Sequence, residues 1–485
     1  MKEILWFDEI NDNDLDTCGG KGVNLGLMVS KDFPIPPGYL VTSKAYFDFI
    51  DEIGIRSKIK NILKDLNVEE TKQLQEASKE IGDLILNNEM SQYLKEKILK
   101  AYSKLKENNN DIHVAVRSSA TAEDLPGASF AGQQDTYLGI NENNLINSVM
   151  KCWASLFTAR AIYYREKNDF SHMDVGIAVI IQKLIEADVA GVMFSRHPSS
   201  GENKVIIEAG FGLGDAIVSG SITPDTYIIN PKKWKIEDKQ ISTQSFKIVR
   251  EGNKTIEVEL NKHTGKRQKL PDEKIIQLAK IGKKIENYYE EGQDMEWAYS
   301  DKLYILQSRP ITTISENKSN SGTSTESSEN AILKGLAASP GIAGGIAKQI
   351  KDASQLSKIT KNDILVTNMT TPDMVPAMKR AQGIVTNEGG MTSHAAIVSR
   401  ELGIPCVVGT SNAMDTLDDG MEITVNGNTG EIYKGLKNDM LEEETEKKSH
   451  EKVSRSAIIT GTNLYVNLSS PEAAEAVSNR NVDGV

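Results

Sequence analysis

The sequence has few cysteines, no long apolar run and no excess of positive charge. Its three cysteines, Cys18, Cys152 and Cys406, are too far apart for a metal or redox motif. No apolar stretch reaches the ~18 residues of a membrane span, and Asp8 and Glu9 stand where a secretory signal would be apolar. Because 68 acidic residues exceed 56 basic ones, the net charge of −12 attracts neither nucleic acid nor anionic membranes. We therefore expect a cytoplasmic protein that meets anionic ligands through local clusters of basic groups.

Two polar stretches divide the 485 residues, a length typical of about three domains. Residues 315–330 contain no large apolar side chain, so we expect a flexible linker. Residues 437–455 are rich in Glu and Lys and predict a second, charged linker. The units that remain are 1–314, 331–436 and 456–485.

The segment Gly389–Val398 places one histidine, His394, at the first turn of a predicted helix. Thr392 or Ser393 can cap this helix, and Gly403 can end it. A helix N-terminus disfavours a protonated imidazole and attracts a phosphoryl group, which suits a histidine that carries phosphate. The alternative is a core histidine below a glycine turn.

The unit around His394 alternates short β runs with helical stretches. The β runs Asp363–Thr367 and Gly383–Thr386 are examples, and this alternation predicts an α/β fold.

The first unit holds scattered features that suit phosphate. Lys21 lies in the glycine loop Gly19–Leu25, which we expect to open a helix, although a C-terminal glycine cap would look alike. Arg117 ends a β run and precedes the small-residue loop Asp124–Thr136, where its guanidinium could bind phosphoryl oxygens. An ordinary surface arginine before a turn is the alternative.

Residues 293–310 predict a β-hairpin turning at Ser300-Asp301. Strand periodicity puts Asp294 and Glu296 on one face, and Gln307 and Arg309 on one face of the returning strand. Carboxylates beside an arginine could hold Mg²⁺ and phosphate, but an exposed hairpin also alternates charges.

The glycine-rich run Gly210–Asp215 follows a predicted strand at 204–209. It lacks the full dinucleotide-binding pattern, and we expect a turn there.

Over residues 3–435 the chain resembles the phosphoenolpyruvate synthase (pyruvate, water dikinase) family of PEP-utilising enzymes. Pyruvate phosphate dikinases and rifampicin phosphotransferases are relatives that share parts of the pattern. The runs that carry the resemblance are GGKGVNLG, PIPPGYLVTSKAY, VAVRSSATAEDLPGASFAGQQDT, CWASLFTARAIYYR, GVMFSRHP, IIEAGFGLGDAIVSG, TPDTYII, QDMEWAY, LYILQSRPIT and GGMTSHAAIVSRELGIPCVVGT.

The resemblance implies an α/β multidomain protein, with an ATP-grasp nucleotide-binding domain and a swivelling α/β phosphohistidine domain. ATP would be the substrate and Mg²⁺ the cofactor. The phosphate-binding positions would be Lys21, Arg117 and, in the covering loop, Gly132 and Thr136. Gln182 would contact adenine, and the metal would be bound by Glu296, Gln307 and Asp294. Arg309 would stabilise the transferred phosphoryl group, and His394 would carry it.

Residues 456–485 resemble the first part of a PEP/pyruvate-binding (β/α)8 barrel, with a strand at 460–467 and a helix at 470–479. A complete barrel needs ~200 residues, so we expect a C-terminally truncated enzyme that encodes the ATP half-reaction and lacks the pyruvate site. The alternatives are a pyruvate phosphate dikinase or related small-molecule phosphotransferase, and a phosphocarrier serving a separate barrel subunit. The chain could also form a homodimer.

Overall fold

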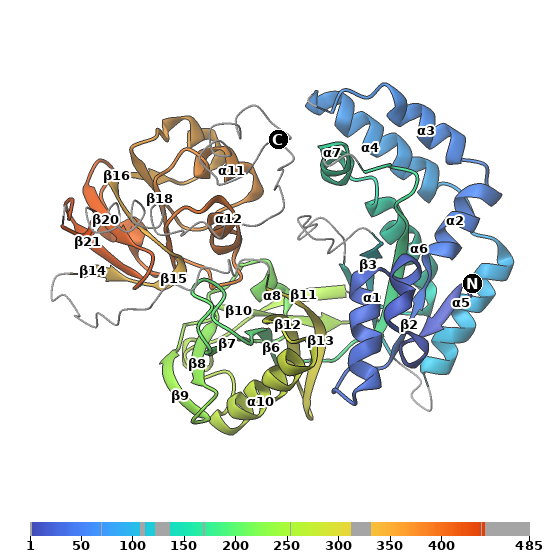
Figure 1. Cartoon of the computed structure of the whole chain (residues 1–485), viewed down its shortest axis with the longest axis horizontal. Coiled ribbons are helices and arrows are strands. Elements are labelled where there is room, and N and C mark those ends of the chain that lie inside the picture. Colours follow the sequence, from blue (N-terminus) through green and yellow to red (C-terminus); the bar gives the residue numbers. More distant parts are fainter. Residues whose placement is uncertain are drawn as a thin grey trace, which may run out of the picture.

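The computed structural model describes residues 2–441 apart from 69, 107–111, 122–135, 168–169, 253, 312–330 and 438. The first predicted linker and the predicted start of a barrel therefore lie outside the described residues. So does the second predicted linker, apart from residues 437 and 439–441. The described chain forms mixed α/β bodies arranged around three large sheets (Figure 1).

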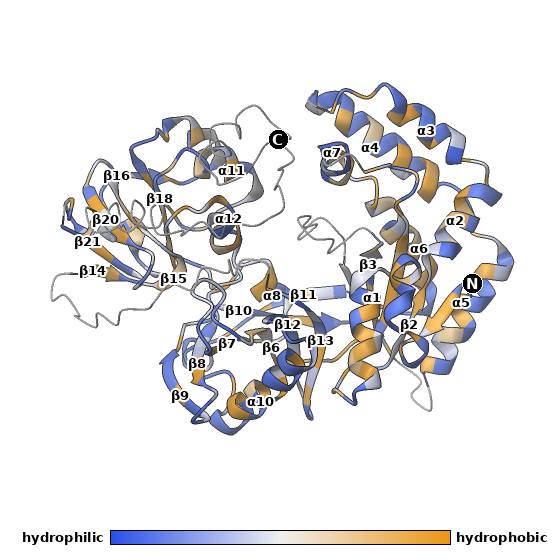
Figure 2. Ribbon diagram, viewed as in Figure 1, coloured by the Kyte–Doolittle hydropathy of each residue, from blue (hydrophilic) through white to orange (hydrophobic). Residues whose placement is uncertain are grey.

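The first body is an antiparallel sheet covered on both faces by helices. Its strands in sheet order are β1 Ile4–Trp6, β2 Gly38–Val41, β5 Ile177–Lys183, β3 Val114–Ala120 and β4 Thr136–Ile140. Its helices are α1 Leu15–Ser30, α2 Ser43–Glu52, α3 Arg56–Lys64, α4 Thr71–Leu86, α5 Gln92–Leu105, α6 Glu142–Ser155 and α7 Ala159–Lys167. These helices show apolar residues on one side and polar residues on the other (Figure 2).

The second body is an antiparallel sheet whose core is completed by a long helix. In sheet order the strands are β13 Leu303–Pro310, β12 Gln293–Tyr299, β6 Val189–Phe194, β7 Val205–Phe211, β8 Asp225–Asn230 and β9 Lys235–Gln240. The helix is α10 Asp272–Tyr289, and the smaller elements are α8 Asp215–Val218, β10 Phe246–Glu251, β11 Lys254–Glu259 and α9 Lys262–Gly265. One apolar core joins this sheet and α10 to α1 and the first sheet, so the two bodies pack as one unit.

The third body is a mixed sheet whose two faces are packed by helices. Its strands in sheet order are β14 Ala331–Lys334, β21 Glu431–Lys434, β20 Glu422–Asn426, β16 Ile342–Ile350, β17 Asp363–Thr367, β18 Gly383–Thr386, β19 Cys406–Val408 and β15 Leu336–Ser339. Strands β16, β17, β18 and β19 run parallel to one another, and β20 and β15 flank them in antiparallel pairing. The helices are α11 Val375–Met378, α12 His394–Leu402 and α13 Ala413–Thr416. The predicted strands at 363–367 and 383–386 and the α/β character are confirmed.

The glycine pair opens a helical segment, as predicted. Gly19 has a φ of 67° and a ψ of 166°, so it separates a short helical segment that begins at Leu15 from the longer one that carries Lys21, and α1 is kinked between them. One local expectation in the first unit is corrected. Strand β7 continues through Gly210 to Phe211, because both residues pair with β6, and the turn begins at Gly212 with a φ of 85°.

A buried ion pair anchors the second body. The side chains of Lys269 and Asp225 are both 0% exposed, and their charged atoms lie 2.7 Å apart. Asp225 also accepts hydrogen bonds from Tyr227 Oη and Ser242 N, at 2.8 and 3.0 Å. A carboxylate held this way depends on its cation, because desolvation of an unpaired charge is costly.

Lys269→Met should therefore lower the free energy of unfolding by about 3–5 kcal/mol. Thermal and urea unfolding of the 485-residue chain measure the loss. Lys239→Met, which removes an exposed pair with Asp272, is the matched control and should change stability by less than ~1 kcal/mol. A loss no larger than that of the control would contradict the proposed dependence of Asp225 on Lys269.

Candidate active site

The predicted hairpin is confirmed as β12 and β13, and its polar residues pair across the strands. Asp294 lies opposite Arg309, and Glu296 lies opposite Gln307, before a register shift at Glu296/Trp297. Arg309 donates to Asp294 Oδ2 from Nε at 3.0 Å and lies 2.9 Å away through Nη2. The hairpin thus presents carboxylate, amide and guanidinium groups along one surface.

Arg117 reaches this hairpin from the first sheet. Its Nη2 lies 3.1 Å from Glu296 Oε2, which brings β3 and β12 together although they are far apart in sequence. Its Nε and Nη1 are buried and have no hydrogen-bond partner among the described residues. A buried guanidinium with two unused donors, held by a carboxylate, suits an anionic ligand with several oxygens.

Lys21 lies beside the same end of β3. Ser119, two residues beyond Arg117, accepts a hydrogen bond from Gly22 N at 3.2 Å and donates to Cys18 O at 2.8 Å. A Cβ atom at Gly19 would lie 2.5 Å from Ser119 O, so this close approach requires glycine. The kink in α1 therefore holds the Lys21 segment against β3.

Two further expected residues lie near Arg117 in the first sheet. Thr136 is the first residue of β4 and pairs with Arg117. Gln182 pairs with Ala115, so it shares the face of Arg117, and its Nε2 is buried without a partner among the described residues. Gly132 lies outside the described residues.

Asp215 is a site residue that sequence reasoning missed, because the run before it was interpreted only as a turn. It begins α8, and burial raises the pKa of its carboxyl. The charge of Arg117 lowers that pKa and the charge of Glu296 raises it, so both groups act on Asp215 electrostatically.

His394 is the first residue of α12, as predicted. Ser393 caps the helix by accepting from Ala396 N at 3.4 Å, and Gly403 ends it with a φ of 65°. Thr370 Oγ1 lies 2.8 Å from His394 Nδ1. When Nδ1 donates its proton to Thr370, the lone pair of the ring lies on Nε2, which is then the nucleophilic nitrogen.

Charged residues of the first two bodies change the pKa values of groups on α12. Burial lowers the pKa of His394, and Arg160 at the start of α7 lowers it further. Burial raises the pKa of Glu401 on the same helix, whereas Arg400 and then Arg309 lower it. The helix of His394 therefore lies within reach of the charged hairpin on one side and of α7 on the other.

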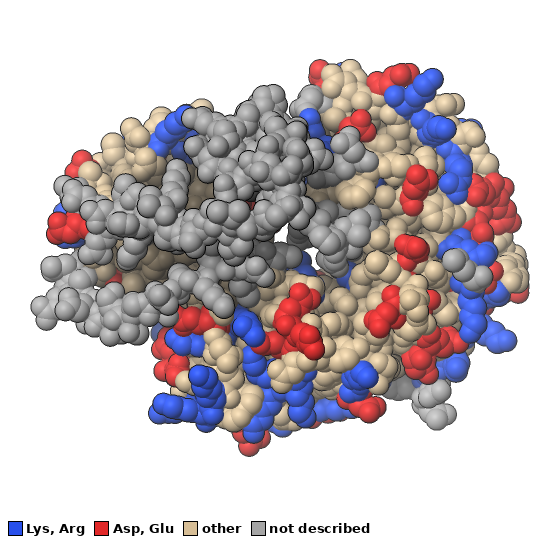
Figure 3. Space-filling model, viewed as in Figure 1, with Lys and Arg blue, Asp and Glu red and all other residues tan. Residues whose placement is uncertain are grey.

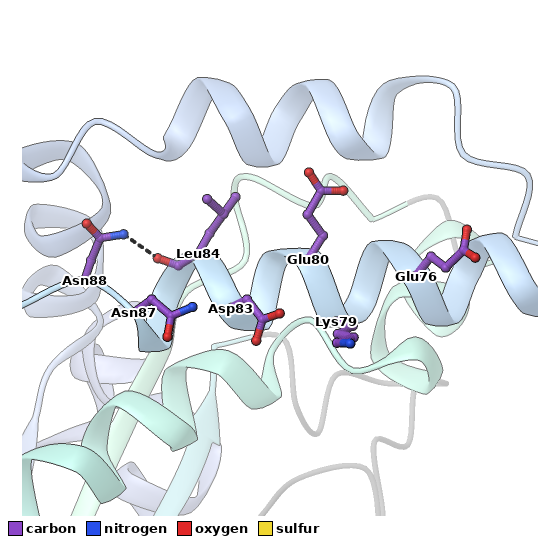
Figure 4. A pocket seen from close by; sticks show the side chains of 7 residues that line it. All are labelled: Glu76, Lys79, Glu80, Asp83, Leu84, Asn87 and Asn88. Carbon is purple, nitrogen blue, oxygen red and sulfur yellow. Dashed lines mark hydrogen bonds between the residues drawn. The ribbon is translucent and has the colours of Figure 1, made fainter.

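Lysines and arginines are interspersed with acidic residues on the described face of Figure 3. A hollow along α4, in which Asn88 donates to Leu84 O at 2.7 Å, is lined by Glu76, Glu80 and Asp83 but by only one cation, Lys79 (Figure 4), so its net negative charge would repel a polyphosphate. None of the described helices is long and apolar enough to cross a membrane.

Two family matches cover most of the chain. Residues 15–330 match the pyruvate phosphate dikinase AMP/ATP-binding domain, and residues 359–430 match the mobile domain of PEP-utilising enzymes.

Curated relatives resemble the chain over nearly its whole length. A probable phosphoenolpyruvate synthase of Archaeoglobus fulgidus is 49% identical, with 99% of this chain and 64% of that protein covered. One of Methanothermobacter thermautotrophicus is 45% identical, with 100% and 71% covered. The phosphoenolpyruvate synthase of Pyrococcus furiosus is 43% identical, with 99% and 65% covered. The chain thus spans roughly two thirds of the length of these relatives.

The pKa of His394 gives a direct test of the arrangement. Arg160→Gln should raise this pKa, because it removes a positive charge that disfavours the imidazolium ion. NMR titration of labelled histidine, with the His394 signal assigned through His394→Gln, measures the change. Arg380→Gln removes a charge from the body of His394 and should leave the pKa unchanged. A pKa that stays constant or falls in Arg160→Gln would place α7 away from His394.

Proposed function

Because the chain belongs to the family of PEP-utilising enzymes with a pyruvate phosphate dikinase AMP/ATP-binding domain, we propose that it catalyses the ATP half-reaction of phosphoenolpyruvate synthesis. His394 attacks the β-phosphorus of ATP, and AMP leaves as the bond to the α-phosphate oxygen breaks. Water then attacks the γ-phosphorus of the pyrophosphohistidine and releases phosphate. Transfer of the remaining phosphoryl group to pyruvate would yield phosphoenolpyruvate.

The buried Arg117, with two unused donors beside Glu296, is the observation that carries the proposal. We assign the first two bodies to an ATP-grasp domain that binds ATP between its two sheets. Lys21 and Arg117 would bind the phosphates, Gly132 and Thr136 would belong to the loop that covers them, and Gln182 would contact adenine.

The charged hairpin would hold the metal and the reacting phosphates. Glu296, Asp294 and Gln307 are the proposed Mg²⁺ positions, and the acidic and amide oxygens present on β12 and β13 suit that ion. When bound, Mg²⁺ would neutralise phosphate charge. Arg309, which Asp294 holds through one carboxylate oxygen, would stabilise the negative charge that develops on the transferred group.

The nucleophile has the protonation state that this reaction requires. Burial and the positive charge of Arg160 keep the imidazole of His394 neutral to a lower pH than usual, because both lower its pKa. The neutral ring has the lone pair that attacks phosphorus. Residues 456–485, which we assign to the start of a pyruvate-binding barrel, lie outside the described residues, so no pyruvate contact is named.

A labelling experiment tests the central assignment. With Mg²⁺ and ATP labelled at the β-phosphate, the chain should take up about one label per chain, stable to base and labile to acid as a phosphohistidine is, and release AMP in equal amount. His394→Ala should abolish labelling yet bind ATP normally, because the nucleophile contributes little to ground-state affinity. Label that persists in His394→Ala would refute the assignment of His394.

A second experiment tests the proposed Mg²⁺ site on the β12–β13 hairpin. Glu296→Gln should keep the fold but slow magnesium-dependent AMP release by ~100-fold or more, because phosphate charge is then poorly neutralised. Asp301→Asn, at the exposed turn of the same hairpin, is the matched control and should release AMP at the normal rate. Normal AMP release from Glu296→Gln would exclude this carboxylate from the metal site.

A further inference from the structure

A buried carboxylate, Glu208, lies where the second and third bodies meet. It belongs to β7, opposite Val192, and is 0% exposed. Its neighbours on the same face, Val192, Phe194 and Ile206, form an apolar core with residues of the third body. Glu208 is thus a charged group within an otherwise apolar contact face.

The hydrogen bonds of Glu208 cross to the segment that precedes His394. Its Oε1 accepts from Met391 N, and its Oε2 accepts from Thr392 Oγ1 at 2.7 Å. The charge of Arg400, on α12, also acts on this carboxylate. Burial raises the pKa of Glu208 above its usual value, and the hydrogen bonds of Thr392 and Met391, together with the charge of Arg400, oppose that rise. These two donors therefore stabilise its negative charge.

Such a group is not explained by stability, because an apolar residue of similar volume would pack in this face without desolvating a charge. What Glu208 adds is directional binding, because a carboxylate accepts hydrogen bonds only from donors placed at its two oxygens. The apolar core brings the bodies together, and Glu208 selects one position of the segment.

Gly390 gives independent support. Its backbone does not adopt the left-handed conformation, unlike that of Gly389 with a φ of 110°. A Cβ atom at Gly390 would instead lie 2.2 Å from Glu208 Oε1 and 2.8 Å from Pro224 Cγ. Glycine at 390 is therefore required by the approach of the carboxylate and not by the turn itself.

Other contacts hold the same segment from both sides. Thr223 Oγ1 accepts from Gly389 N at 3.1 Å and donates to the Glu388 carboxylate. Arg400, on α12, donates to Met391 O at 2.7 Å and to Ala338 O at 3.0 Å. The segment continues directly into the cap and first residue of α12, so its position determines that of His394.

We propose that Glu208 is a positioning residue that docks the segment 389–392 onto the nucleotide-binding part of the chain and thereby sets the pose in which His394 receives its phosphoryl group. The role at His394 rests on the proposed function. When the third body moves away, water donates to the two Glu208 oxygens in place of Met391 N and Thr392 Oγ1. Water also accepts the hydrogen bonds that these two groups had donated to Glu208, so the net change in hydrogen-bond free energy is small. The contact is therefore suited to repeated docking and release.

Hydrogen–deuterium exchange tests the docking without any reaction. Glu208→Leu removes both acceptors at similar volume and should speed exchange in the peptide that covers residues 388–393 by roughly 10-fold or more. Glu286→Leu is the matched control, because Glu286 is also a buried carboxylate of the second body but pairs with Arg196 and Lys283 on its own side. It should leave exchange at 388–393 unchanged. Unchanged exchange in Glu208→Leu would overturn the docking.

The rate of self-labelling from ATP tests the positioning. Glu208→Leu should slow labelling at saturating ATP by roughly 10- to 100-fold while the Kd for ATP stays normal, since it removes hydrogen bonds to a charged group outside the ATP site. Glu208→Gln keeps the shape and one acceptor and should restore part of the rate. A fall in ATP affinity together with the rate, or normal labelling despite faster exchange, would overturn the positioning role.

A second pair of variants covers the case that Glu208→Leu does not fold. Thr392→Val removes the donor of the hydrogen bond from Thr392 Oγ1 to Glu208 Oε2, and Glu208→Gln alters its acceptor. Because both changes affect one hydrogen bond, their effects on exchange and labelling should be less than additive in the double variant. Full additivity would overturn the proposal. If the wild-type chain takes up no label, the proposed function fails, while the exchange results still decide whether Glu208 docks the segment.

Discussion

The ion pair between Arg117 and Glu296 is the contact on which the site depends. It links β3 of the first sheet to β12 of the second, and so it brings together groups that lie on separate sheets. In a chain of net charge −12, a polyphosphate can bind only where local cations outweigh the general repulsion. Glu296 holds one nitrogen of Arg117 and leaves two buried donors, so the cation is oriented before any ligand arrives.

The third body is held by two kinds of contact with different consequences. The apolar core shared by Val192, Phe194 and Ile206 with the His394 body favours association but specifies no single pose. The polar contacts at Glu208 and Thr223 are directional, and both reach the segment before α12. A mobile carrier of phosphate needs this combination, because it must return to one geometry after each excursion.

Much of the local structure could be predicted because its signals are short-range. Ser393 and Gly403 marked both ends of α12, and period-two alternation placed Asp294 and Glu296 on one face of a hairpin. The strand limit at 209 was wrong, because pairing with β6 extends β7 to Phe211. The helical segment that begins at the glycine pair was predicted, but the short helical segment before Gly19 was not. The roles of the candidate site residues in binding ATP, metal and phosphate remain predictions.

The sequence by itself determined the α/β character, the hairpin and the helix that begins at His394, since caps, periodicity and turn residues act over a few positions. Only the tertiary structure decided that Arg117 meets Glu296 and that Glu208 binds the segment before His394. These contacts join positions up to 184 residues apart. They follow from how sheets pack and strands register, and no local pattern encodes which distant partner a buried carboxylate will meet.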